Sequence, residues 1–462
     1  MQSTKSRIKN GIITSGSSQG DEAMKYLVTT IQCGAGVNSN LLRNMLVFAK
    51  RHNVEKILVY VMPGRHKEDT VIAPSLQLEE MIEFISTDRN GQALNTNLKL
   101  YDTGILASQI NPLTGFSTKL HRDYSYILPS PKIRYQSIAN TSTYPRFLAT
   151  TGALTHGNYK LHTAQGRKAE LEHEYGFAYV YIRNSRLFDY QPVMAQKNGS
   201  FNFGREHYRS GQVTYQDPEA LVLGDWHTGD TCTKTRAVTI KMIETLKPKR
   251  VVFHDLFNGH SINHHERNNN VSKARSWGDD RAVLEDEVKA CRNELNFFAA
   301  RFPDVNFLVV ESNHDLFLTK YIGEDNFLED GQNSIFSCRL FVEINKKPKQ
   351  PVLKTAMELI GKVESNVTFL SEDQEYRVNG VGLDYHGHRG VNGARGSGAS
   401  FDRFNLRLIS AHEHSPKIYA NGIVVGTSTK LKLGYTKGAG SWLNAHALLY
   451  KSGKYTLLTI IH

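Results

Sequence analysis

The sequence predicts an α/β protein built around three apolar strands that each end in residues able to bind a metal ion. The first strand, 221–223, breaks at Gly224 and continues as Asp225-Trp-His227. The second ends at Asp255, and the third runs into Asn313-His314-Asp315. Helical patterns at 234–246 and 279–301 separate these strands. Because strands that alternate with helices form parallel sheets, we expect the site at the carboxyl edge of such a sheet.

The length of the chain favours two domains. Its 462 residues exceed what one ordinary hydrophobic core contains. Asp217-Pro218 is a plausible boundary, because proline restricts the residue before it and often starts a new element. We expect a flexible tail over residues 1–22, an α/β accessory domain over 23–217 that places substrate or mediates oligomerisation, and the site-bearing domain over 218–462.

The first half predicts a βαβ unit. A β-branched strand over 26–31 precedes a helix over 38–51 with Asn40 as its cap, and a second strand follows at 56–62. A helical patch is expected at 76–85, with strands at 98–101, 147–151 and 177–182. Aromatic and cationic residues interleave between Tyr181 and Arg209, as on a surface that stacks nucleic acid. A two-sided strand with buried aromatics and solvated cations gives the same pattern and is the favoured interpretation.

Composition narrows the class of protein. Hydrophobic residues make up 40% and charged residues 22%, which is typical of a folded globular chain. The net charge of +11 favours a polyanionic partner such as nucleic acid. The 4 cysteines are widely spaced, which argues against a zinc ribbon and a disulfide framework. No stretch has the apolar length needed to cross a bilayer, so we expect a cytoplasmic protein without a membrane partner.

The last third of the chain adds more histidines at the ends of strand-like runs. The run from 381 ends at His386, and the run from 404 ends at His412-Glu-His414. A glycine-rich basic loop containing Arg389 and Arg395 lies between them. Residues 417–425 and 445–461 alternate as hairpins that would pair antiparallel and complete a sheet.

Taken in order, these blocks resemble the calcineurin-like metallophosphoesterases. That family carries Asp-x-His, Gly-Asp-x-x-Asp, Gly-Asn-His-Asp/Glu, a lone His, and Gly-His-x-His. The resemblance covers 221 to the end of the chain and implies a two-sheet sandwich flanked by helices. It also implies two divalent metal ions, with Mn²⁺ preferred and Mg²⁺, Fe, Zn²⁺ or Ni²⁺ as alternatives, because mixed nitrogen and oxygen ligands suit such ions.

The resemblance assigns a role to each residue. One metal would be held by Asp225, His227 and His414, and the other by Asn313, His386 and His412, with Asp255 bridging them. Two cations about 3.5–4 Å apart can clamp a phosphate, and a metal-bound hydroxide would attack phosphorus. His314 is the implied catalytic histidine, and Asp315 would orient it.

Some positions depart from the family pattern. His254 replaces the glycine before Asp255, Ser312 and Ala411 replace two other glycines, and Asn258 replaces the second acid of its block. The loss of this charge is the most serious departure. His260 or His264 could compensate, although a surface histidine loop is the favoured interpretation.

Two short sequence blocks favour a nuclease. Asp255-Leu-Phe and His412-Glu-His414 are similar to blocks of the Mre/SbcD-type DNA-repair nuclease subunits. The series Arg389, Arg395, Arg403 and Arg407 adds positive charge, and phosphate contacts dominate affinity for DNA. We therefore expect a DNA phosphodiesterase of the host-DNA degradation or repair type. The alternatives are a phosphomonoesterase or small-nucleotide phosphodiesterase, and a weakly catalytic DNA-binding scaffold.

Overall fold

A six-stranded sheet contains the parallel strands that the sequence predicts. The computed structural model describes residues 7–9, 12–14, 23–65, 70–85, 91–142, 144–263, 269, 271, 274, 277–278, 281–397, 406–433 and 436–462. The sheet order is β19-β18-β17-β16-β25-β26, in which the first four strands are parallel and the last two are antiparallel. The strands are β16 (Ala220–Val222), β17 (Arg250–Phe253), β18 (Asn306–Val310), β19 (Val367–Leu370), β25 (Ala445–Leu449) and β26 (Tyr455–Thr459).

Both faces of this sheet are buried, which explains why its strands are almost continuously apolar. Side chains alternate across a strand, so Val222 and Leu308 face one core while Leu221 and Phe307 face the other. The second core lies beneath helices α5 (Thr233–Leu246) and α7 (Leu284–Arg301). These two helices correspond to the helical patterns of the sequence.

A ten-stranded sheet forms the facing layer and crosses the expected domain boundary. Its order is β20-β21-β22-β24-β23-β9-β10-β8-β7-β6. The strands before the boundary are β6 (Gln92–Asn95), β7 (Leu98–Leu100), β8 (Ser125–Leu128), β9 (Tyr135–Ile138) and β10 (Arg146–Thr150). Those after it are β20 (Arg377–Val378), β21 (Val381–Gly382), β22 (Arg407–Ser410), β23 (Lys417–Ile418) and β24 (Gly422–Val424).

The two halves of the chain share one hydrophobic core. Strand β9 pairs with β23, so that Tyr135 lies opposite Ile418. The same core contains Ala149 of β10 and Leu457 of β26. A separate accessory domain that ends at residue 217 is therefore not confirmed, because strands from both sides of that boundary are hydrogen-bonded neighbours.

A five-stranded sheet completes the layer opposite the ten-stranded sheet. Its order is β12-β11-β3-β4-β5, and its edge strand β12 lies beside β26, where Thr456 donates a 2.6 Å hydrogen bond to the carbonyl of Pro192. Helix α1 (Ser39–His52) covers its outer face. The strands are β3 (Met24–Gln32), β4 (Lys56–Met62), β5 (Ile82–Phe84), β11 (Gly176–Ile182) and β12 (Phe188–Met194).

The expected βαβ unit is present, because β3 and β4 pair in parallel on either side of α1. The cap of α1 is Asn38 and not Asn40, since the Asn38 side chain accepts the amide hydrogen of Leu41. The helix expected at 76–85 is wrong. Only Pro74–Gln77 is helical there (α2), and β5 pairs in parallel with β4, so sheet pairing overrides the local helical spacing.

The interleaved aromatics of the first half belong to the core, as favoured from the sequence, but the expectation that the cations are solvated is wrong at Arg183. Phe188, Tyr190 and Tyr208 are buried, and buried Arg183 forms an ion pair with Asp189.

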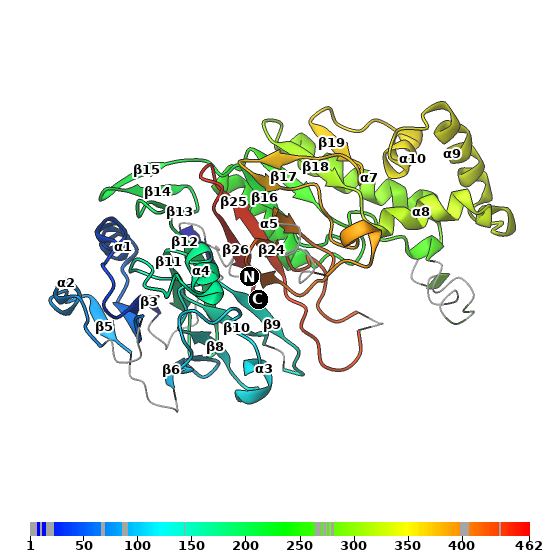
Figure 1. The fold of residues 1–462 in the computed structure, drawn as a ribbon. Helices are drawn as coiled ribbons and strands as arrows, with labels where there is room; N and C mark the ends of the chain where they lie inside the picture. The colour runs from blue at the N-terminus through cyan, green and yellow to red at the C-terminus, as the bar shows by residue number, and fades with distance from the viewer. Residues whose placement is uncertain are drawn as a thin grey trace, which may run out of the picture.

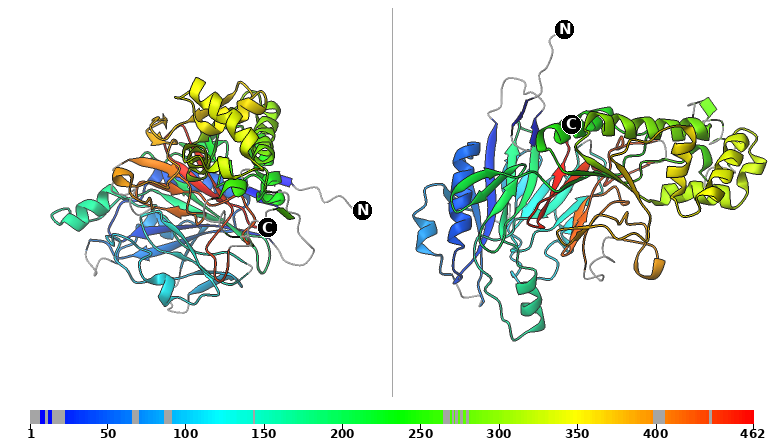
Figure 2. Two further views of the ribbon diagram at one scale, coloured as in Figure 1. Left: turned by 90° about the vertical axis from the view of Figure 1, so that its right-hand side faces the viewer. Right: turned by 90° about the horizontal axis from the view of Figure 1, so that it is seen from above.

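Figures 1 and 2 show helices α7, α8, α9 and α10 gathered at one end of the molecule and α1 and α2 at the other. Within the described residues, no helix is long and apolar enough to cross a membrane.

The remaining helices are α3 (Phe116–Lys119), α4 (Ala164–Leu171), α8 (Asn313–Gly323), α9 (Ser334–Lys346), α10 (Val352–Ile360), η1 (His260–Ile262), η2 (Asn326–Glu329) and η3 (Val391–Gly393). The remaining strands are β1 (Arg7–Lys9), β2 (Ile12–Thr14), β13 (Phe201–Phe203), β14 (Glu206–Arg209) and β15 (Gln212–Tyr215), of which β1 and β2 pair within the segment expected to be a flexible tail.

Candidate metal centre

The predicted ligands come together where loops from the two facing layers meet. Asp225 and His227 follow β16, Asp255 follows β17, and Asn313 begins α8 after β18. From the ten-stranded sheet come His386, His412 and His414, which follow β21 and β22. The carboxyl ends of parallel strands lie at one edge of a sheet. The residues that follow β16, β17 and β18 are therefore brought together by the sheet itself, as their sequence pattern predicts.

Asp225, His227 and His414 form one close set of donor atoms. Nε2 of His414 lies 3.2 Å from Oδ2 of Asp225 and 3.1 Å from Nε2 of His227. Oδ2 of Asp225 also accepts the backbone amide of His412 at 2.9 Å, which fixes the orientation of the carboxylate. This is the set that the resemblance assigns to one metal.

A second set surrounds Asn313. Its Oδ1 lies 3.0 Å from Nε2 of His386 and 3.0 Å from Nδ1 of His412. Oδ2 of Asp255 is 3.3 Å from Nε2 of His386 and 3.5 Å from Nε2 of His227. Asp255 thus lies between the two sets, and each cluster of three potential ligands found among the described residues includes it.

The backbone is strained at these positions. His227, Asp255, His412 and His414 all have left-handed φ angles of 45°, 44°, 75° and 56°. Non-glycine residues rarely adopt this conformation, which costs of order 1–3 kcal/mol per residue, and such strain gathers at functional sites. The backbone conformation that directs these four side chains toward the cluster therefore lowers the stability of the fold.

Burial sets the protonation of the cluster. It lowers the pKa of His227 to about 3 and of His412 to about 4, so both imidazoles are neutral and offer a lone pair. Burial, reinforced by the charge of Asp255, raises the pKa of Asp225 well above its usual value. Burial alone would raise the pKa of Asp255, but the neighbouring His386 and His314, together with the hydrogen bond to His386, outweigh it and lower that pKa.

The cluster fits metal ions, because several of its buried polar atoms lack another partner. Oδ1 of Asp225 and Oδ1 of Asp255 are buried and accept no hydrogen bond from the part of the chain that the structure describes. Nδ1 of His227, of His386 and of His414 is likewise buried without a hydrogen-bond partner in the described part of the chain. Unsatisfied buried groups of this kind are costly, and a cation between them satisfies both nitrogen and oxygen donors.

His314 lies beside the cluster, but Asp315 does not orient it as expected. The ring of His314 is 4.6 Å from that of His227, and its Nδ1 donates to the carbonyl oxygen of Asn258 at 2.5 Å. Asp315 closes a capping box at the start of α8 by accepting the amide of Ser312 at 3.0 Å. The positioning role expected of Asp315 belongs to the Asn258 backbone.

Asn258 and His260 meet at a residue that the sequence did not single out, Asp230. This buried carboxylate accepts hydrogen bonds from Nδ2 of Asn258 at 2.9 Å, Nε2 of His260 at 2.8 Å and Nη1 of Arg281 at 2.8 Å. Asp230 lies only five residues after Asp225, so the negative charge missing at Asn258 is present nearby. The sequence does show an additional acid in the loop after β16. Its hydrogen-bond partners, however, lie 28 to 51 residues away along the chain, so its role could not be recognised from the sequence.

The basic loop is directed elsewhere. Nε of Arg389 forms a 2.7 Å ion pair with Glu372, and Arg395 is exposed. Nη2 of Arg407 donates to the carbonyl of Gly453 at 2.7 Å. Arg403 and His264 lie outside the described residues. Neither Arg389 nor Arg395 lines the cavity at the cluster.

An open cavity of about 400 Å³ lies directly against the cluster. Its rim carries the aromatic rings of Phe317 and Trp442, which pack 4.8 Å from His314 and 4.2 Å from His414 respectively. The lining residues are His227, Asp255, Asn258, His260, Asn263, Asn313, His314, Phe317, His412, Glu413, His414 and Trp442.

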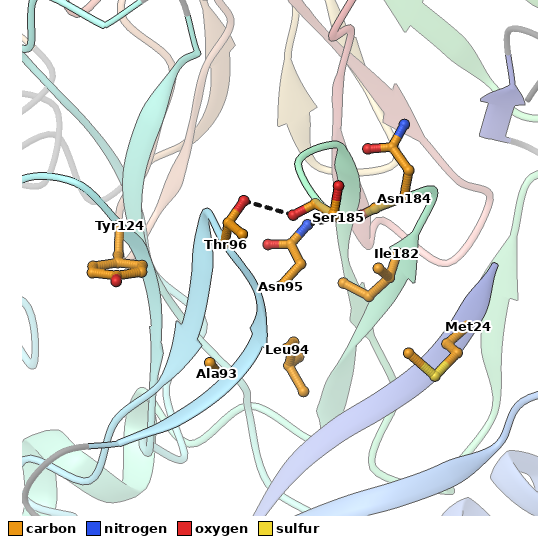
Figure 3. Close-up of a pocket in the computed structure, with 9 residues that line it drawn as sticks. All are labelled: Met24, Ala93, Leu94, Asn95, Thr96, Tyr124, Ile182, Asn184 and Ser185. Carbon is orange, nitrogen blue, oxygen red and sulfur yellow. Dashed lines mark hydrogen bonds between the residues drawn. The ribbon is translucent and has the colours of Figure 1, made fainter. Parts of the chain in front are cut away.

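A second cavity of about 510 Å³ lies between the β6–β7 hairpin and the β11–β12 turn (Figure 3). Thr96 donates a 2.6 Å hydrogen bond to the carbonyl of Ser185 across it, and Asn95 bonds to Asn184. Its lining contains neither a charged side chain nor a histidine, so it lacks the carboxylates and imidazoles that gather at the cluster.

The chain is similar to one curated phage protein. Protein A1 of Escherichia phage T5 is 25% identical over 482 residues, covering 97% of this chain and 84% of that protein. No family model matches the chain. Among solved structures, Vps29 of Chaetomium thermophilum in complex with a cyclic peptide is 11% identical and covers 41% of this chain and 98% of its own, with a TM-score of 0.24. A likeness this weak supports no statement about fold or activity.

Proposed function

We propose that this protein is a two-metal-dependent phosphodiesterase that hydrolyses DNA. The observation that carries the proposal is the central place of Asp255 between two sets of histidine, aspartate and asparagine donors. Mixed nitrogen and oxygen donors of this kind suit Mn²⁺, Fe, Zn²⁺ or Ni²⁺ better than Ca²⁺, and we take Mn²⁺ as the ion to test first. When bound, two such metal ions would neutralise the charge of a phosphodiester and supply a water-derived nucleophile at neutral pH.

The residues of the chain provide the rest of the chemistry. Neutral His227 and His412 present lone pairs without first losing a proton. The capping box of Ser312 and Asp315 fixes the first turn of α8, and with it the placement of Asn313 and His314. Nδ1 of His314 is held by the Asn258 carbonyl, and within the described residues no hydrogen bond occupies its other ring nitrogen, which could face a phosphate oxygen.

DNA is the preferred substrate because of the nuclease-like spellings at Asp255 and His412 and the net charge of +11. One observation favours the small-nucleotide alternative. Arg389 is paired with Glu372, which offsets part of the positive charge that the arginine series was expected to offer to DNA.

Cleavage assays with purified protein and Mn²⁺ test the proposal. Linear and circular DNA, single- and double-stranded, should be cut by the wild type and by Asp304→Asn, an exposed control for the same change of charge. Asp255→Asn should be inactive. Cleavage of DNA should fall steeply with salt, whereas cleavage of bis(p-nitrophenyl) phosphate should not. Hydrolysis of the small ester without cutting of any DNA would exclude the nuclease.

A further inference from the structure

The group around Asp230 is a built hydrogen-bonding site next to the metal centre. Asp230 is 3% exposed and is surrounded by three side-chain donors. Burial alone would raise the pKa of Asp230, but His260, Asn258 and Arg281 outweigh it and hold that pKa well below its usual range. Its hydrogen bond to Nε2 of His260 fixes one ring nitrogen of that histidine. The arrangement is a carboxylate–imidazole pair, which in enzymes sets the tautomer and direction of a proton-transferring histidine.

His260 is also held through its backbone. It begins the short helix η1, and its amide donates a 2.9 Å hydrogen bond to Glu287 of α7. Ser261 donates to the same carboxylate through its hydroxyl. The position of His260 is therefore fixed from two sides, by the loop after β16 and by α7.

The remaining ring nitrogen of His260 is available to a ligand. The residue lines the cavity that also contains Asp255 and His314, and its side chain is 19% exposed. Within the described part of the chain, the hydrogen bonds of the ring are all formed by Nε2, and Nδ1 forms none. Among the described residues, His260 belongs to none of the clusters of potential metal ligands.

His260 differs in protonation from the histidines that surround the cluster. Burial lowers the pKa of His227, His412 and His414. Burial acts in the same direction on His260, but the hydrogen bond and charge of Asp230 outweigh it and raise its pKa. One cavity thus contains imidazoles suited to donate a lone pair and one imidazole suited to donate a proton.

We propose that His260 is the general acid of the reaction and that Asp230 is its positioning residue. This proposal rests on the phosphodiesterase function above. A water-derived oxygen forms a bond to phosphorus while the bond between phosphorus and the leaving sugar oxygen breaks. Nδ1 of His260 gives its proton to that oxygen, which departs as an alcohol. The histidine becomes neutral and takes a proton from solvent, and water supplies the remaining oxygen of the product phosphate.

Leaving-group dependence tests this role. The deoxyribose oxygen of DNA needs a proton to depart, whereas p-nitrophenolate does not. His260→Gln should reduce kcat on DNA by on the order of 100-fold and leave kcat on bis(p-nitrophenyl) phosphate little changed. Asp230→Asn should show the same asymmetry. His121→Gln, at an exposed histidine far along the chain, is the matched control.

The pH profile gives a second readout. The groups that face His260 are Asp230, Arg281 and Glu287, with His314 on the neighbouring helix α8. Activity of the wild type on DNA should decline at high pH as the acid loses its proton, and His260→Gln should lack this limb. Mn²⁺-dependent thermal stabilisation of each variant verifies that the fold and the metal site are intact.

Each other result overturns the proposal. Equal losses on both substrates would make His260 a phosphate-binding or structural residue, and no loss on either would remove it from the reaction. In both cases the phosphodiesterase function stands. If the wild type with Mn²⁺ cleaves neither substrate, the phosphodiesterase function fails and the acid role fails with it.

Discussion

Asp225 should destabilise the metal-free protein, and its replacement by asparagine tests the metal centre without an activity assay. The carboxylate is fully buried beside Asp255, and its pKa is raised by burial and by that neighbouring charge. A group whose pKa is raised in the folded state contributes stability at low pH that is lost as the pH rises. The metal-free protein therefore loses stability when Asp225 ionises.

The magnitude follows from linkage. Each unit by which the pKa is raised costs about 1.4 kcal/mol once the group is ionised, so metal-free Asp225→Asn should be more stable than the wild type at pH 8 and should lose this advantage at pH 5.5. The asparagine oxygen can still accept the amide of His412, which preserves the local geometry. Applied to a chain of 462 residues, the average unfolding entropy per residue makes 1 kcal/mol about 1 °C in Tm.

Bound Mn²⁺ should reverse the order of stability of the wild type and Asp225→Asn. A ligand at 100 times its Kd stabilises the folded state by about 2.7 kcal/mol, or about 3 °C here. Wild-type protein should gain this with Mn²⁺, whereas Asp225→Asn should gain little. Thermal unfolding with EDTA and with Mn²⁺, at pH 5.5 and pH 8, measures both effects, and Asp304→Asn controls for the change of charge.

Two outcomes would refute the reasoning. If Mn²⁺ stabilised Asp225→Asn as much as the wild type, Asp225 would not be a ligand. If the EDTA-treated variant were less stable than the wild type at pH 8, the buried carboxylate would not be a source of strain.

Three further changes probe the frame around the site. Gly224→Ala should lower Tm and Mn²⁺ affinity, because a Cβ would lie 2.8 Å from the carbonyl oxygen of Ala445; unchanged Mn²⁺ titrations would contradict this. His446→Leu removes a buried ring bonded to the Gly224 amide, and chemical denaturation should record a loss of about 1–3 kcal/mol. Glu206 has a pKa of about 2 in place of 4.5 because its bonds to His52, Tyr208 and Arg51 outweigh burial. Its contribution of about 3 kcal/mol is present above pH 4.5 and lost toward pH 2, so Glu206→Gln should flatten the acid limb of a stability–pH curve.

The ligand-bearing strand ends could be predicted from the sequence because they depend on local pattern. Asp225, Asp255 and Asn313 each follow an apolar run, and parallel strands bring such ends to one edge. The regular helices α5 and α7 were likewise visible in their periodicity. The roles given to these residues as metal ligands stay predictions.

What the sequence could not predict depends on contacts between distant segments. The pairing of β9 with β23 joins residues about 280 positions apart, and neither strand indicates its partner. The partners of Asp230 lie on η1 and before α7, so its role is defined only once those segments fold against the loop after β16. The helix expected at 76–85 failed for the same reason, because pairing with β4 determined the conformation there.

The metal centre and the Asp230 group use one physical effect with opposite results. Burial lowers the pKa of His412 more than the nearby charge of Asp255 raises it, so the imidazole is neutral and suited to be a ligand. The same burial beside an ionised partner retains the proton, as at His260, and this prepares an acid. The pKa of Asp230 is in turn held low by His260, Asn258 and Arg281 against the opposing effect of burial. If His260 is the general acid, as we propose, asparagine at position 258 has a physical role, because it leaves Asp230 as the carboxylate bonded to the ring of that histidine.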